Sequence, residues 1–182
     1  MKNVKVFMAN GLEEIEALTV VDLLRRAGIT VSTVSITGDK LIHGAHGIDI
    51  MADELFEDAN AETADMLVLP GGMPGTAHLQ EHQGLEKLLT VFNEEKKYIA
   101  AICAAPGILG KLGFLKGRRA ASYPSEEGKL LGAQVVQEPA VISDHIITSR
   151  GVGTAIDFGL TIISELISKE KADEISASIV YG

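Results

Sequence analysis

Cysteine is almost absent from this chain, because Cys103 is the only one among 182 residues. One cysteine cannot form a disulfide within the chain, so nothing here requires an oxidising compartment. The sequence also lacks the run of about 20 apolar residues that a membrane-spanning helix needs. The opening residues MKNVKVFMANG hold only a short apolar run before a turn, unlike a signal peptide. We therefore expect a cytoplasmic protein that does not associate with membranes.

An excess of positive charge is missing as well. The chain has 16 Lys and Arg residues against 25 Asp and Glu residues, with a formal net charge of -9 and a pI near 5.0. This balance disfavours nucleic acid or an anionic membrane as a partner. With 46% hydrophobic residues and no low-complexity run, the chain can bury a full core. Its length suits one domain, which we expect to span residues 1–182.

Short apolar runs rich in β-branched residues alternate with longer segments of helical periodicity. The runs indicate strands at Val4–Met8, Val31–Ile36, Met66–Leu69, Tyr98–Ile102 and His145–Thr148, and the periodic segments indicate helices at Glu13–Ala27, His82–Glu95 and Thr154–Ser168. This alternation predicts an α/β fold, a doubly wound sandwich in which helices cover both faces of a mostly parallel sheet. Two smaller features are expected beside it, an antiparallel excursion at Lys40–Leu55 and a hairpin-like pair within Val135–Thr148 that turns at Ser143-Asp144.

Three loops should meet at one edge of that sheet. They follow the first strand at Ala9-Asn10-Gly11, the Met66–Leu69 strand at Pro70-Gly71-Gly72, and the Tyr98–Ile102 strand at Cys103. Ligands of such folds bind at the carboxyl ends of the strands. We therefore expect the chemistry of the protein at this edge.

The lone cysteine stands in the stretch AICAAPG, where a buried strand turns sharply into a helix. A turn of this kind lifts a nucleophile out of the sheet and aims backbone N–H groups at it. Only small neighbours such as Ala104 fit beside such a turn, and Pro106 is tolerated in the first helical turn. At a helix N-terminus the pKa of a thiol is lowered, so we expect a nucleophilic Cys103. The alternative is a buried cysteine that serves as a small apolar side chain.

Glu16 is a carboxylate on the apolar face of the Glu13–Ala27 helix. At 100° per residue it shares that face with Val20 and Leu23. Burial raises the pKa of a carboxyl group, and the neutral form can donate a hydrogen bond to a thiolate or shuttle a proton. The alternative is a structural hydrogen bond to a loop amide. Glu13 shares the face, but an acid in a first turn also serves the helix dipole.

The remaining motifs are weaker. In VLPGGMPG, the amides of Gly71 and Gly72 can form an oxyanion hole, although Gly-Gly after Pro is also a common turn. The stretch SRGVGT opens a helix and could bind an anion, but it lacks the dinucleotide fingerprint, so we predict no cofactor. The five histidines, His43, His46, His78, His82 and His145, lack the spacing of a zinc motif. We predict loop or surface roles for them and no metal site.

Four blocks in order, GLEEIEALTVVDLLRRAGI, VLPGG, AAICAAPGIL and TSRGVGTAIDFGL, resemble the ThiJ/PfpI superfamily. The resemblance covers nearly the whole chain and is strongest to the branch that holds the Parkinsonism-associated protein deglycase and bacterial YajL. It implies a flavodoxin-like sandwich, a homodimer and a cytoplasmic location. It also implies that Cys103 is the nucleophilic, oxidation-prone cysteine, that Glu16 is the protonated acid bonded to it, and that Gly72 and the Ala104 amide stabilise an oxyanion.

Many members of the superfamily have a histidine beside the cysteine or before a proline in the loop that caps the pocket. Ala104 and Tyr123 stand at those two positions here, so we place Tyr123 in the pocket and do not predict a Cys-His-acid triad. His46 stands where the animal proteins have arginine, and Val152 replaces a proline of the last block.

The leading functional prediction is cysteine-dependent, glutathione-independent detoxification of reactive dicarbonyls, of the glyoxalase or deglycase type. Cys103 would add to an aldehyde carbon and Glu16 would shuttle the proton, with a free dicarbonyl or a glycated protein or nucleotide as substrate. One alternative is an oxidative-stress-sensing or chaperone homodimer in which Cys103 is oxidised to a sulfinate. A further alternative is a cysteine hydrolase or a thiamine-related enzyme.

Overall fold

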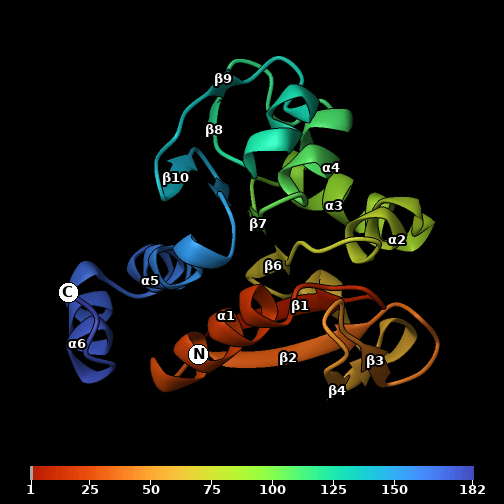
Figure 1. Ribbon diagram of the computed structural model, residues 1–182, viewed down its shortest axis with the longest axis horizontal. Coiled ribbons are helices and arrows are strands. Elements are labelled where there is room, and N and C mark those ends of the chain that lie inside the picture. Colours follow the sequence, from red (N-terminus) through yellow and green to blue (C-terminus); the bar gives the residue numbers. More distant parts are fainter. Residues whose placement is uncertain (1) are drawn as a thin grey trace.

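The computed structural model describes residues 2–182. Its centre is a seven-stranded sheet with the order β10-β11-β7-β6-β1-β2-β5 (Figure 1). These strands are Asn3–Met8 (β1), Thr30–Ser35 (β2), Glu54–Leu55 (β5), Met66–Leu69 (β6), Tyr98–Ile102 (β7), Ala140–Ser143 (β10) and Ile146–Ser149 (β11). All neighbours run parallel except β10 and β11, which pair antiparallel. The expected mostly parallel sheet is confirmed.

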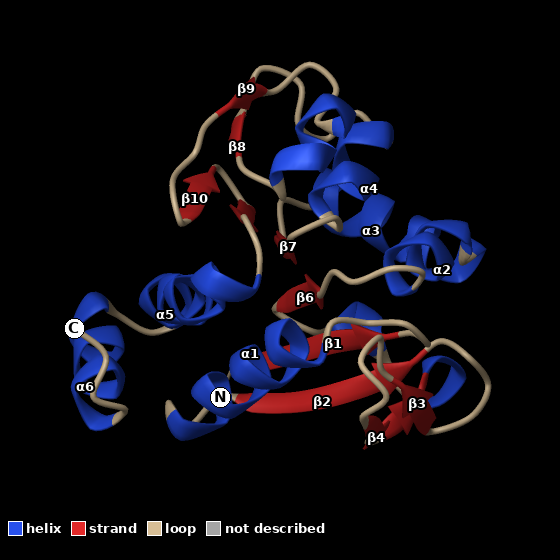
Figure 2. Ribbon diagram, viewed as in Figure 1, coloured by secondary structure: helices blue, strands red, loops and turns tan. Residues whose placement is uncertain are grey.

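Six α-helices flank the sheet within residues 2–182 (Figure 2). They are Glu14–Arg26 (α1), Gly75–Glu81 (α2), Gln83–Glu94 (α3), Pro106–Lys111 (α4), Ala155–Leu166 (α5) and Lys169–Ser178 (α6), and four short 3-10 helices lie at Phe56–Asp58, Ala61–Thr63, Pro124–Lys129 and Val152–Thr154. The helices α1, α5 and α6 bury their apolar side chains in one cluster, and α2, α3 and α4 bury theirs in a second cluster on the other face. This two-sided covering is the doubly wound sandwich that the alternation predicts, and it agrees with the flavodoxin-like fold that the family resemblance implies.

The central strands are apolar on both faces because helices cover both. All four residues of β6 are buried, and so are the last five of β1. The one cation among them, Lys5, is 5% exposed and lies 2.7 Å from the Glu54 carboxylate of β5. A buried charge requires such a partner, so this ion pair ties the sheet edge to its centre.

The segments outside the main sheet agree only partly with expectation. Leu41–His43 (β3) and Asp49–Met51 (β4) form the expected antiparallel excursion, but β5, which ends the same segment, joins the main sheet beside β2. The expected pair near the C-terminus is a hairpin of β10 and β11 with its turn at residues 144–145. Val135 is not part of that hairpin: Gln134–Val135 (β9) pairs with Arg119–Ala120 (β8) in a separate two-stranded sheet.

No helix among residues 2–182 has the length and apolar character to cross a membrane.

Candidate functional site

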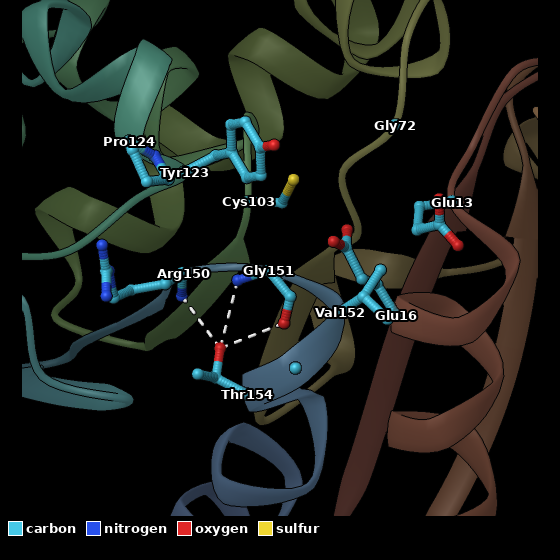
Figure 3. A pocket seen from close by; sticks show the side chains of 11 residues that line it. Glu13, Glu16, Gly72, Cys103, Tyr123, Pro124, Arg150, Gly151, Val152 and Thr154 are labelled. Carbon is cyan, nitrogen blue, oxygen red and sulfur yellow. Dashed lines mark hydrogen bonds between the residues drawn. The ribbon is translucent and has the colours of Figure 1, made fainter.

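The loops after β1, β6, β7 and β11 surround a pocket of about 560 Å³ at the carboxyl edge of the sheet (Figure 3). Residues from all four loops and from the loop before the third 3-10 helix line it: Glu13, Glu16, Gly72, Cys103, Tyr123, Pro124, Arg150, Gly151, Val152, Gly153 and Thr154. The predicted meeting of these loops is therefore present, with a fourth loop, after β11, that the prediction did not include.

Cys103 occupies the sharp turn between β7 and α4. Its φ angle is 65°, a left-handed conformation that residues with a side chain rarely adopt. Backbone hydrogen bonds hold it there: the Cys103 N–H donates to the Ser149 carbonyl at 3.1 Å, and the Tyr123 N–H donates to the Cys103 carbonyl at 2.8 Å. Such strain costs about 1–3 kcal/mol and is concentrated at functional sites. The turn leaves the thiol half-buried on the pocket wall.

Glu16 lines the same pocket as Cys103, and its side chain comes from α1. It is 1% exposed, and its Oε2 accepts a hydrogen bond from the Gly71 N–H at 2.9 Å. Within the described residues, the buried Oε1 has no hydrogen-bond partner. Figure 3 shows the Glu16 carboxyl group facing the Cys103 side of the pocket. The structural hydrogen bond to a loop amide is therefore present through Oε2, while Oε1 is unpaired among the described residues and the proton shuttle stays a prediction.

The two groups strongly affect each other's ionisation. Burial raises the pKa of Glu16 to about 7, although the adjacent Cys103 thiol and the Gly71 N–H oppose this shift. Burial and the neighbouring Glu16 carboxylate raise the pKa of the Cys103 thiol to about 12. The predicted lowering of the thiol pKa is therefore wrong. The helix-start amides do favour the thiolate, but burial and an adjacent carboxylate outweigh them. Between these two pKa values the pair holds one proton.

Two of the three predicted oxyanion amides, those of Gly72 and Ala104, face the sulfur and favour its thiolate form. The third, the Gly71 N–H, donates to Glu16 Oε2 at 2.9 Å and is not available to an oxyanion. Gly72 has a φ of 91°, and a side chain there would collide with the backbone of Glu13 and Gly11. Gly71 is not in the pocket lining, but a Cβ there would lie 2.5 Å from the Cys103 Cβ. The two glycines therefore allow the β6 loop to pack directly against Cys103 and α1.

Tyr123 lies in the pocket as expected, next to a small open space before Gly151. A Cβ built on Gly151 would lie 3.4 Å from Tyr123 Cδ2, 3.8 Å from Glu16 Oε1 and 4.0 Å from Cys103 Sγ. The absence of a side chain at Gly151 thus leaves room for a small group that touches the thiol, the acid and the ring together.

Sequence reasoning named the SRGVGT stretch as a weak candidate for anion binding without singling out Arg150, and it gave Glu13 only a helix-dipole role. Glu13 is the N-cap of α1, where its side chain accepts from the Ile15 N–H, and it lines the pocket as well. The signal for Arg150 was its place just after a strand that ends at the same sheet edge. Thr154 Oγ1 holds its loop by accepting from the N–H groups of Arg150 at 3.2 Å and Gly151 at 3.1 Å.

Two histidines differ from expectation. His145 lies in the β10–β11 turn, which agrees with a loop role, but it is buried at 4% exposed, with Nδ1 3.1 Å from Asp144 Oδ2. His46 is exposed, but it does have acidic partners: its Nδ1 lies 2.9 Å from Glu14 Oε2 and 3.3 Å from Glu13 Oε2. These three side chains place one ligand atom each within 4.8 Å of one another. Local spacing could not find this cluster because His46 comes from the β3–β4 loop.

Comparisons with known proteins agree with this geometry. The family model of the DJ-1/PfpI family matches residues 2–165. The chain is 38% identical over 182 residues to Protein DJ-1 homolog A of Arabidopsis thaliana, covering 98% of this chain and 46% of that protein, so it spans about half the length of this curated relative. It is 32% identical over 164 residues to the glutathione-independent glyoxalase DJR-1.2 of Caenorhabditis elegans, covering 90% of this chain and 87% of that protein.

Among solved structures, oxidised Toxoplasma gondii DJ-1 superposes with a TM-score of 0.96 at 34% identity, and the match covers 100% of both chains. The resemblance that the four sequence blocks indicate is therefore confirmed over almost the whole chain. This chain belongs to the DJ-1/PfpI family.

Proposed function

We propose that the protein converts reactive 2-oxoaldehydes such as methylglyoxal to 2-hydroxy acids, without glutathione or another cofactor, with Cys103 as nucleophile and Glu16 as proton shuttle. The observation that carries this proposal is the strained Cys103 turn facing the buried Glu16 across one pocket. The C. elegans relative named as a glutathione-independent glyoxalase supports the reaction class.

The first step is addition of sulfur to the aldehyde carbon. Above the Glu16 pKa of about 7, the carboxylate is ionised and the thiol keeps its proton, so as the S–C bond forms, the thiol proton passes to Glu16. The aldehyde oxygen gains negative charge and takes this proton from Glu16 to give a hemithioacetal. The amides of Gly72 and Ala104, which already point at the sulfur, would stabilise that oxyanion.

The second step is an internal oxidation and reduction. Glu16 removes the proton from the former aldehyde carbon and delivers it to the keto oxygen, which gives an enediol. The proton of the hemithioacetal hydroxyl then passes through Glu16 to the adjacent carbon. The first carbon is thereby oxidised to a thioester and the second is reduced to an alcohol. Water then hydrolyses the thioester, releasing the hydroxy acid and the thiol. Methylglyoxal plus one water gives lactate, so no external oxidant or reductant is needed.

The test is lactate production from methylglyoxal in the absence of glutathione. Wild type should turn over, while Cys103→Ala and Glu16→Gln should each lose turnover, because the first lacks the nucleophile and the second cannot carry the proton. Glu86→Gln, which changes an exposed glutamate of α3, is the matched control and should keep wild-type turnover. Turnover that persists in Cys103→Ala, or its absence in wild type, would contradict the proposal.

A redox sensor is the second candidate function. The unpartnered Glu16 Oε1 is the observation in its favour, because a protonated carboxyl group there can donate a hydrogen bond to a sulfinate formed on Cys103. The solved Toxoplasma gondii relative is described as oxidised. Peroxide treatment followed by intact mass measurement separates the two functions. Wild type without turnover, but with sulfinate on Cys103 at low peroxide, would favour the sensor.

We further propose that the protein acts as a homodimer. Ile15 and Leu18 are apolar and exposed on α1, and Ile48 and Met51 are exposed on the neighbouring β3–β4 segment. Light scattering at several concentrations should give twice the mass of the chain, and Leu18→Glu should reduce it to that of one chain.

A further inference from the structure

Arg150 differs from the other four arginines in having no hydrogen-bond or ion-pair partner for its guanidinium among the described residues. Arg25, Arg26, Arg118 and Arg119 each form an ion pair with a carboxylate. Among residues 2–182, no acceptor hydrogen-bonds to the Arg150 guanidinium, and its Nε is buried without a partner. Arg150 also lines the pocket that holds Cys103. A charged donor that is partly withdrawn from water and unpaired is costly, and a ligand that pairs with it would remove that cost.

The pocket is electrically asymmetric. In Figure 3, Arg150 and Glu13 lie on opposite sides, with Cys103 between them. Glu13 is already partly satisfied, because its carboxylate accepts from the Ile15 N–H and lies 3.3 Å from His46 Nδ1. Arg150 has no such compensation. A ligand in this pocket would therefore direct a negative group toward Arg150 and away from Glu13.

The pocket is also larger than the smallest substrates require. Its volume of about 560 Å³ lies in the range of roughly 300–1,000 Å³ that is typical of sites for drug-sized ligands. A dicarbonyl of five heavy atoms that reaches Cys103 would leave the Arg150 side of the pocket empty. Guanidinium binds carboxylate and phosphate oxygens through paired donors.

We propose that Arg150 is an oxyanion subsite, so that the preferred substrates are 2-oxoaldehydes that carry a carboxylate or phosphate group. This inference rests on the proposed function and names its substrate class. The anionic group stays unchanged through the reaction. For 4,5-dioxopentanoate, the aldehyde carbon is oxidised to a carboxylate, the keto carbon is reduced to an alcohol, and one water is consumed, which gives 2-hydroxyglutarate.

The test compares kcat/KM for 4,5-dioxopentanoate and for the phosphate ester of hydroxypyruvaldehyde with kcat/KM for methylglyoxal. In Arg150→Gln, the ratio of the anionic to the neutral substrate should fall by about tenfold or more, the size of a lost charge-assisted hydrogen bond. Arg150→Lys should recover part of it. Lys87→Gln, which removes one charge from the exposed surface of α3, should leave the ratio unchanged. The two anions distinguish a carboxylate site from a phosphate site.

A binding measurement separates failure of this inference from failure of the proposed function. Glutarate has two carboxylates and no aldehyde, so it should slow iodoacetamide alkylation of Cys103 in wild type and not in Arg150→Gln. Protection without turnover would contradict the proposed function and support the subsite. An unchanged substrate ratio in Arg150→Gln, or equal protection in both proteins, would overturn the subsite.

Discussion

Replacing Gly151 by alanine should abolish activity without weakening the fold. The added methyl group would occupy the space that Tyr123, Glu16 and Cys103 share, at 3.4, 3.8 and 4.0 Å from their nearest atoms. All three distances are ordinary van der Waals contacts, so nothing has to move. Gly151 has an extended backbone, with φ 160° and ψ -165°, which alanine can adopt. Replacing a glycine in such a conformation stabilises a protein by about 0.4–1 kcal/mol, because it reduces the entropy of the unfolded chain.

The effect on the reaction follows from the same distances. A carbon about to be attacked lies about 3–3.5 Å from the nucleophile, and a displacement of 1 Å can cost about 100-fold in rate. A methyl carbon 4.0 Å from Sγ blocks the approach through this space. We therefore expect kcat/KM for methylglyoxal to fall by about 100-fold or more in Gly151→Ala, at an unchanged or slightly higher Tm.

The assay is lactate formation together with thermal unfolding of the same samples. Gly128→Ala is the matched control, since a Cβ at Gly128 meets nothing within 4 Å and the residue does not line the pocket. Peroxide oxidation of Cys103, followed by mass, checks that the thiol remains accessible to a small reagent. Wild-type kcat/KM in a stable Gly151→Ala protein would refute the argument, because the reacting carbon would then bind elsewhere.

Three further predictions concern Glu16 and Gly71. Glu16→Gln removes the charge that helps to raise the pKa of the Cys103 thiol, so this pKa should fall from about 12 toward its ordinary value of 9.0. The measurement is the pH midpoint of iodoacetamide alkylation, which should shift downward. An upward shift would contradict this. The Glu16 pKa is raised from 4.5 to about 7, so protonated Glu16 stabilises the folded state. This contribution to the free energy of unfolding is complete below pH 4.5, is lost as the pH rises through 7, and amounts to about 3 kcal/mol. In urea unfolding, Glu16→Gln should therefore gain stability relative to wild type between pH 5 and pH 8, and a constant difference would count against a buried, ionising Glu16. Gly71→Ala places a methyl group against Cys103 Cβ and Glu16 Oε2, so we expect it to lose about 1–3 kcal/mol of stability, with turnover lost as well. Full stability and turnover would show that the β6 loop can move aside.

Much of the fold was predictable because strong local patterns and burial coincide. The strands Met66–Leu69 and Tyr98–Ile102 have the predicted bounds, since both are apolar runs that helices cover on each face. The assignment of β5 failed for a physical reason: two residues carry too little pattern to show that they pair with β2 rather than with the excursion. The partner of Val135 was missed because its strand is equally short.

The candidate site was predictable where one element carries the signal. Glu16 stood out as an acid on an apolar helix face, and Cys103 as a cysteine at a strand-to-helix turn. The direction of the shift in the thiol pKa was not predictable in this way. It depends on how deeply the fold buries Cys103 and on how close the fold brings the Glu16 carboxylate to it. The unpaired Nε of Arg150 is likewise a property of the folded chain, since only the fold shows that it is buried without a hydrogen-bond partner among residues 2–182.

Cys103 stands where the two layers of the sandwich meet. Its own side chain packs against the apolar cluster that holds α1 and Glu16, while α4, the helix that follows it, packs in the other cluster across the sheet. The alignment of Cys103 with Glu16 therefore depends on both layers being docked at once. The proposed turnover therefore reports whether the tertiary structure is complete. A partly unfolded state in which either helical layer has separated from the sheet would keep most of its secondary structure but would be inactive.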